Sequence, residues 1–92
     1  MKEMEMLGDF FKASSQDARI GPTHICLYVS LLQFWKESGY QSPIRIKRSE
    51  IMGLSRIAGP ATYHRVLRDL VEQGYIKYEA RYDRKGSKVV LY

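Results

Sequence analysis

The first residues of the chain carry apolar side chains at the spacing of an α-helix. Met4, Leu7 and Phe11 fall on one side of a helix over residues 1–15, which predicts an amphipathic helix of about four turns. The pattern breaks at residues 17–21. A helix face this apolar does not suit a free tail, so we expect it to pack on another element or to pair two chains.

A second helix is predicted directly after this break. Pro22 suits its first position, where a missing N–H costs nothing, and Gly39 suits the position after its end at Ser38. Its apolar residues form two stripes: Ile25, Tyr28, Leu32 and Trp35 in one, and Leu27, Leu31 and Phe34 in the other. A surface helix needs one stripe, so the second helix is either central or covered. The natural cover is the N-terminal helix, from the same chain or from a second copy.

Short elements follow a loop over residues 40–43. Residues 44–47 alternate apolar and basic side chains, which predicts a very short strand. Ser49 is the expected N-cap of a short helix. We expect the buried side of this helix to consist of Ile51, Met52 and Leu54. A turn over residues 55–59, with the small Ala58 and Gly59, then leads into the next helix.

The last helix and the C-terminal hairpin have clear boundaries in the sequence. Pro60 opens a helix that runs to Gln73 and ends before Gly74. Its expected inner face is formed by Tyr63, Leu67 and Leu70, flanked by Val66 and Val71. Residues 75–82 and 87–92 are predicted strands, joined by a turn over 83–86.

This order of elements is that of a winged helix-turn-helix. The expected fold class is therefore α+β, mainly α, with a three-helix core, a C-terminal β-hairpin wing and an extra N-terminal helix. Residues 1–18 are the N-terminal amphipathic helix and a possible dimerisation element. Residues 19–92 are the expected DNA-binding domain.

Length and composition exclude several classes. At 92 residues the chain is one domain, too small for the common catalytic folds. One cysteine cannot form an internal disulfide, and Cys26 is expected to be a small buried residue. His24 lies two positions away on the same helix, so the two side chains point in different directions and make a poor nucleophile–base pair. We find no metal-ligand set and no phosphate-binding loop, and expect no enzyme activity and no cofactor.

The expected location is cytoplasmic, associated with the nucleoid. The longest nearly apolar run, residues 25–35, is too short to span a bilayer. The N-terminus is acidic and does not look like a secretory signal. The basic residues fall on a turn and a short helix face rather than along one amphipathic helix, which disfavours a membrane-surface role.

Charge is distributed unevenly along the chain. Residues 1–43 have net charge −1 and residues 44–92 have net charge +6, which together give the overall +5. A concentrated basic half indicates a polyanion partner, with a solvated basic surface as the plain alternative.

The candidate contacts to double-stranded DNA are the short, polar or basic residues of the helix-turn-helix and the hairpin. Arginine can bind guanine through two hydrogen bonds, threonine can contact a base edge or a phosphate, and a helix N-terminus can bind a phosphate. A solvated helix face or an exposed turn would account for the same residues without DNA. The candidates are Arg48, Ser49, Arg56, Ala61, Thr62, His64, Arg65, Arg68, Arg81, Arg84, Lys85 and Lys88.

Two segments resemble a known family. Residues 57–78, IAGPATYHRVLRDLVEQGYIKY, resemble the recognition helix and wing of small bacterial winged helix-turn-helix DNA-binding proteins, above all in ATYHR and GYIKYE. Residues 17–35, DARIGPTHICLYVSLLQFW, resemble the first helix of those proteins. The relatives are regarded as transcriptional regulators, often on mobile elements, and the N-terminal winged helix of plasmid replication initiators is more distantly similar. In the relatives Ser-Lys often stands where this chain has Gly59-Pro60, so one possible lysine–phosphate contact is missing.

The resemblance covers roughly residues 17–92 and implies sequence-specific duplex-DNA binding by a transcriptional regulator. The alternative is a replication-initiation or protein-interaction module. Single-strand or RNA binding through Tyr75, Tyr78 and Tyr82 is a weaker alternative, because packing under the wing explains these tyrosines better. A homodimer would place two recognition helices about 34 Å apart on a pseudo-palindromic site. No small-molecule ligand is evident, and the chain has no room for a separate sensing module.

Overall fold

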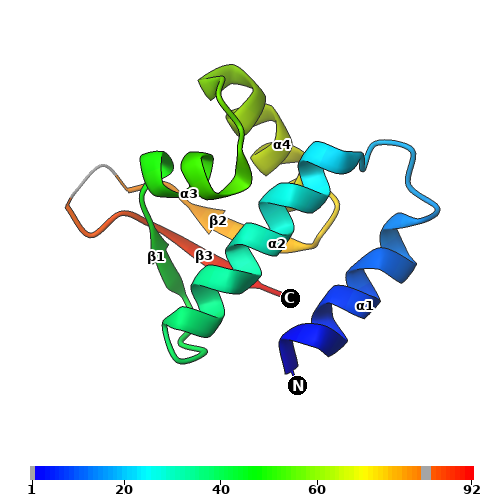
Figure 1. Cartoon of the computed structure of the whole chain (residues 1–92), viewed down its shortest axis with the longest axis horizontal. Helices are drawn as coiled ribbons and strands as arrows, with labels where there is room; N and C mark the ends of the chain where they lie inside the picture. The colour runs from blue at the N-terminus through cyan, green and yellow to red at the C-terminus, as the bar shows by residue number, and fades with distance from the viewer. Residues whose placement is uncertain (1, 82–83) are drawn as a thin grey trace.

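The structure is a computed structural model that describes residues 2–81 and 84–92. Within these residues the chain has an α+β fold, mainly helical, with four helices and one three-stranded antiparallel sheet (Figure 1). The elements are α1 (Lys2–Ser14), α2 (Pro22–Glu37), β1 (Ile44–Ile46), α3 (Arg48–Ser55), α4 (Pro60–Glu72), β2 (Ile76–Glu79) and β3 (Ser87–Leu91). The predicted order of helices and strands is confirmed for the described residues.

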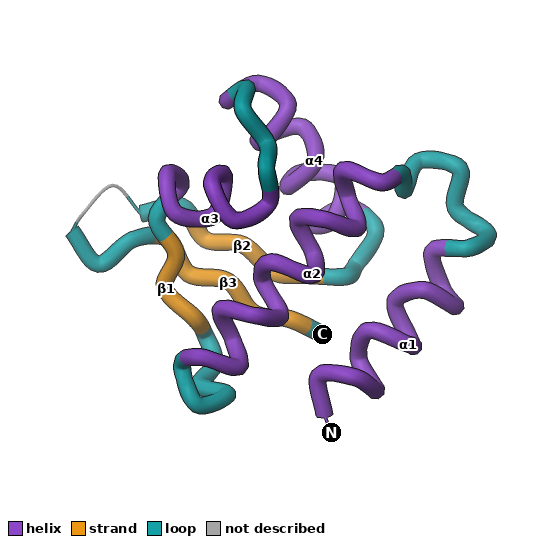
Figure 2. Tube along the Cα trace, viewed as in Figure 1, coloured by secondary structure: helices purple, strands orange, loops and turns teal. Residues whose placement is uncertain are grey.

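The strands lie in the order β1-β3-β2, so the last strand is the centre of the sheet. Val89 in β3 is paired with Ile44 on one side and with Tyr78 on the other. Figure 2 shows α2 crossing one face of this sheet, with α1 alongside α2. Helices α3 and α4 both contact α2, and α4 also contacts β2. The hydrophobic core lies between these helices and the inner face of the sheet.

Helix α2 is buried on two sides, as its two apolar stripes predict. Leu27 and Leu31 are fully buried, and so is Tyr28 at 1% exposure. The α1 helix of the same chain covers the Tyr28 side, where Phe10 stacks on the Tyr28 ring with centroids 4.0 Å apart. Phe10 also meets Tyr75 edge to face. Residues 2–14 therefore share one core with the rest of the domain.

The N-terminal end of α1 has its own attachment to the domain. The Tyr40 hydroxyl donates a hydrogen bond to the Glu3 carboxylate over 2.8 Å. The Tyr40 ring packs edge to face on Trp35, and the Lys2 ammonium lies over the Trp35 ring. Tyr40 has φ +63°, so this contact uses a backbone conformation that non-glycine residues rarely adopt. We name the Glu3–Tyr40 hydrogen bond the α1 latch.

A buried histidine joins α2 to α4. His24 is 5% exposed, and its Nδ1 accepts a hydrogen bond from the backbone N–H of Gly21. Because Nδ1 accepts, Nε2 carries the hydrogen and donates it to the Asp69 carboxylate, 2.8 Å away. His24 thus closes the N-terminus of α2 and fixes α4 against it. This contact directs the Asp69 carboxylate toward α2 and away from the exposed basic face of α4.

The expected N-cap of α3 is wrong. The helix begins at Arg48, and its N-cap is Lys47, which is extended at φ −106° and makes no side-chain capping bond. Ser49 lies inside the first turn and is exposed. The chain turns directly from β1 into α3, which allows both Ile46 and Ile51 to be buried. Leu54 is 45% exposed rather than buried, because this two-turn helix buries only a narrow stripe.

Two further burial predictions are wrong, and one strand is shorter than expected. Cys26 is exposed, because it lies between the two buried stripes of α2 on the side that faces solvent. Val71 is 37% exposed at the edge of α4. Strand β2 ends at Glu79, because the Ser87 side chain, and not the strand ladder, accepts the Arg81 N–H. Residues 82 and 83 of the predicted strand and turn lie outside the described residues.

None of the described helices has the length and apolar composition needed to cross a membrane.

Candidate nucleic-acid interface

Helix α4 has one buried and one basic side. Tyr63, Val66, Leu67 and Leu70 are buried against the core. Ala61, Arg65 and Arg68 lie in line at i, i+4 and i+7 on the opposite side, and all three are exposed. His64 is exposed beside them, and its ring packs edge to face on Tyr63. None of the ion pairs among the described residues includes Arg65 or Arg68.

The N-terminus of α4 is open. Gly59 is its N-cap, with extended backbone and no side-chain capping bond, and Pro60 follows as the first helical residue. The backbone N–H groups of Ala61 and Thr62 have no acceptor within the helix, which makes this end attractive to an anion. Thr62 is half-buried, so its hydroxyl lies at the edge of the exposed stripe.

Helix α3 and the following turn add three predicted residues to the same region. Arg48 and Ser49 are exposed in the first turn of α3. Arg56 is exposed at the C-cap of α3, with φ +63° and its N–H directed to the Gly53 carbonyl. A shallow groove runs from Arg48 and Arg56 to Pro60 at the start of α4. The two arginines therefore border the open end of α4.

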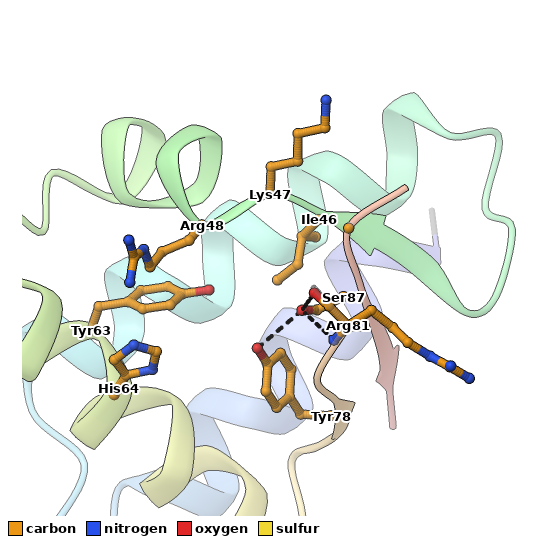
Figure 3. Close-up of a pocket in the computed structure, with 9 residues that line it drawn as sticks. Ile46, Lys47, Arg48, Tyr63, His64, Tyr78, Arg81 and Ser87 are labelled. Atoms are coloured by element: carbon orange, nitrogen blue, oxygen red, sulfur yellow. Dashed lines mark hydrogen bonds between the residues drawn. The ribbon is translucent and has the colours of Figure 1, made fainter. Parts of the chain in front are cut away.

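The remaining predicted residues lie in different parts of the hairpin. Arg84 and Lys85 are exposed in the turn between β2 and β3. The Arg81 guanidinium forms an ion pair with the Glu79 carboxylate over 2.9 Å. Figure 3 shows the Arg81 side chain pointing away from His64. Lys88 is half-buried on the outer face of the sheet, because the next residue of β3, Val89, faces the core. The structure does not bring Lys88 together with α4, whereas Arg81 borders a cleft that α4 also lines.

A cleft of about 340 Å³ lies between the start of α3, the side of α4 and the hairpin (Figure 3). Its lining residues are Ile46, Lys47, Arg48, Tyr63, His64, Tyr78, Arg81, Gly86 and Ser87. Burial raises the pKa of Tyr63 to about 12, with a further rise from Tyr78, while Arg48 acts in the opposite direction. The Tyr78 hydroxyl donates a hydrogen bond to Ser87.

Sequence reasoning missed Lys47 and Tyr63 as functional candidates and considered Tyr78 only for single-strand or RNA binding. The alternation of residues 44–47 could have indicated that Lys47 is exposed at the end of β1. No local signal indicates the distance between Tyr63 and Tyr78, which depends on how the hairpin packs against α4.

Comparisons with protein-family models, with curated proteins and with solved structures find no match to this chain. The described residues contain no group of three or more His, Cys, Asp and Glu side chains that could hold a metal ion. The region can offer cations, open helix N–H groups and a cationic aromatic cleft to an anionic partner.

Proposed function

We propose that this protein is a winged helix-turn-helix that binds double-stranded DNA sequence-specifically and acts as a transcriptional regulator. The order α2-β1-α3-α4-β2-β3 and the strand order β1-β3-β2 are compatible with this fold. The observation that carries the proposal is the exposed side of α4. There Ala61, Arg65 and Arg68 form a stripe with both arginines unpaired among the described residues.

In the proposed complex, α4 lies in the major groove. Arg65 and Arg68 are long enough to reach base edges, and arginine binds guanine O6 and N7 through two hydrogen bonds. Ala61 near the helix N-terminus allows close approach to the groove. The open N–H groups at the start of α4 bind a phosphate, as helix N-termini do in many proteins.

The elements on either side of α4 hold the DNA backbone. Arg48 and Ser49 from α3 and Arg56 from the turn contact phosphates on one side of the groove. Arg84 and Lys85 of the hairpin contact the backbone or the minor groove on the other side. Such contacts set the orientation of the protein but carry no sequence information themselves.

The backbone conformation of Arg56 supports this assignment. Glycine is the residue most often found at the left-handed position after a helix, because a side chain there costs about 1–2 kcal/mol. Here the position holds an exposed arginine at φ +63°. Arg56 makes no ion pair or side-chain hydrogen bond with the described residues that would repay this cost. A contact made by the guanidinium outside the chain gives a reason for an arginine at this position.

We infer that two chains pair through α1 and α2. Met4 is 60% exposed and Phe11 is 46% exposed on α1, although Phe10 between them is buried. Val29 of α2 is 40% exposed beside a shallow apolar groove that Met4 and Leu7 help to line. Light scattering is expected to give twice the 10.7 kDa mass of one chain. Changing Met4 and Phe11 to lysine should give monomers without removing the buried Phe10, and a wild-type mass of one chain would contradict the pairing.

Selection of bound duplexes from a random pool, followed by footprinting, tests the proposed function. We expect enrichment of one motif, as two half-sites about one DNA turn apart if the dimer forms. Arg65→Ala should abolish enrichment of that motif. Lys77→Ala also removes one exposed charge, but from the outer face of the sheet, so it should leave the motif unchanged. A pool that enriches no motif would contradict sequence-specific binding and favour the protein-interaction alternative.

A further inference from the structure

The cleft between α3, α4 and the hairpin has the features of a small-molecule site. Its volume of about 340 Å³ lies at the lower end of the range typical of ligand pockets. The described lining residues include Lys47, Arg48 and His64 but no aspartate or glutamate. They belong to three separate parts of the chain, so the cleft exists only in the folded domain.

A tyrosine that is otherwise buried presents its hydroxyl to this cleft. The Tyr63 side chain is 1% exposed, and Figure 3 shows its hydroxyl pointing toward the space between Ile46 and Tyr78. No hydrogen bond joins this hydroxyl to another described residue, and its oxygen is open to the cleft rather than fully enclosed, whereas the neighbouring Tyr78 hydroxyl donates to Ser87. Because burial holds the pKa of Tyr63 near 12, the hydroxyl remains a donor at neutral pH. A donor that opens into the cleft and has no protein acceptor is available to an acceptor bound there.

The walls of the cleft limit what that acceptor can be. The half-buried ring of Tyr78 in β2 provides most of the apolar surface, and the nearly buried Ile46 at the end of β1 lies beside it. Arg48 brings positive charge to the cleft from the start of α3 and is exposed, whereas the side chain of Lys47 points away from the other lining residues (Figure 3). A simple inorganic anion would use the charges but leave the apolar walls uncovered. A flat ring bearing an anionic group would use both.

We propose that this cleft binds a planar aromatic molecule that carries one carboxylate or phosphate group. The ring lies against Ile46 and Tyr78. The anionic group is held near Arg48 and accepts the hydrogen bond of the Tyr63 hydroxyl. Arg48 and His64 also belong to the proposed DNA interface, so a bound ligand lowers duplex affinity. This last consequence alone depends on the proposed function.

The direct test is titration of the ¹⁵N-labelled full chain, followed by amide chemical shifts, with benzoate, adenosine 5′-monophosphate and inorganic phosphate as separate probes. We expect benzoate or the nucleotide to saturate at about millimolar concentration or below, with shifts confined to residues lining the cleft. Comparison of these two probes distinguishes a carboxylate from a phosphate ligand. Inorganic phosphate should bind at least about tenfold more weakly, because it cannot use the apolar walls.

A matched pair of variants tests the role of the Tyr63 hydroxyl. Tyr63→Phe removes one oxygen and keeps the ring, and it should weaken binding of the aromatic anion about tenfold. Tyr92→Phe removes a hydroxyl from an exposed residue and should have no effect. Equal affinity for inorganic phosphate, no saturation by either aromatic probe, or unchanged binding to a folded Tyr63→Phe protein would each overturn the proposal.

Duplex binding by the same variants separates the two proposals. Tyr63→Phe should bind duplex DNA as the wild type does, because its hydroxyl is buried in the cleft. If the aromatic anion binds in the cleft but no duplex motif is ever selected, the proposed function fails and the cleft assignment stands. If a motif is selected but neither probe binds, the cleft assignment alone fails.

Discussion

Changing Arg56 to glycine should stabilise the domain and weaken DNA binding at the same time. Arg56 has φ +63°, where a non-glycine residue costs about 1–2 kcal/mol. Glycine removes this cost but loses about 0.5–1 kcal/mol through the greater freedom of the unfolded chain. The expected net gain is therefore about 0.5–1 kcal/mol, which corresponds to a rise of about 2–8 °C in Tm for a domain of this size.

The binding effect has the opposite sign because the guanidinium is lost. Each neutralised phosphate contributes about −0.9 to the slope of log K against log salt concentration, so Arg56→Gly should make that slope shallower by about one. Calorimetry gives the change in Tm, and duplex titrations at several salt concentrations give the slope. Arg56→Lys keeps both the charge and the backbone cost, so its Tm and slope should stay close to those of the wild type.

Either of two results would refute this reasoning. A lower Tm for Arg56→Gly would mean that the arginine side chain stabilises the turn by contacts that outweigh the backbone cost. An unchanged salt slope would mean that Arg56 does not contact a phosphate.

Three further predictions concern the core and the α1 latch. Phe10→Ala should lower the free energy of unfolding by about 3–5 kcal/mol, and Phe11→Ala by much less, as measured by urea unfolding; equal losses would contradict the aromatic stack. The α1 latch should stabilise the fold fully between about pH 4.5 and 10, the ordinary pKa values of Glu3 and Tyr40, and weaken progressively outside that range. Hydrogen bonds from the Glu3 backbone N–H and then from the Tyr40 hydroxyl lower the pKa of the Glu3 carboxyl, so the latch loses its stabilisation as pH falls below about 4.5. The hydrogen bond to the Glu3 carboxylate raises the pKa of Tyr40, so the latch also loses its stabilisation as pH rises above about 10. Tyr40 ring shifts should report both transitions, and a flat profile would refute the latch. Burial raises the pKa of Tyr28 and of Tyr63 to about 12, so both should ionise only with alkaline unfolding. The free energy of unfolding should therefore fall as pH rises from about 10 to 12. Ionisation of either tyrosine near pH 10 in the folded protein would refute this prediction.

The element order was predictable because it depends on local signals. Prolines at positions 22 and 60 suit helix starts, and glycines at 39 and 74 adopt φ +77° and +80° at helix ends. Apolar periodicity likewise predicted that α2 is buried on two sides. These features require only neighbouring residues along the chain, so one sequence is sufficient to find them.

The features that depend on contacts distant in sequence were not predictable. His24 and Asp69 are 45 positions apart, and neither position alone indicates that the two pair. Lys88 was grouped with the hairpin turn because of its charge, but the alternation of side chains in β3 places it on the outer face of the sheet. The cleft requires α3, α4 and the hairpin together.

The most direct test of the central claim measures the affinity of wild-type protein and Arg65→Ala for the selected duplex and for its single-base variants. If α4 reads the major groove, Arg65→Ala should lose about 1–3 kcal/mol on the selected duplex and no longer discriminate at one base position, with discrimination elsewhere retained. A loss that is uniform across all sequences, or no loss at all, would contradict the assignment of α4 as the element that reads DNA sequence.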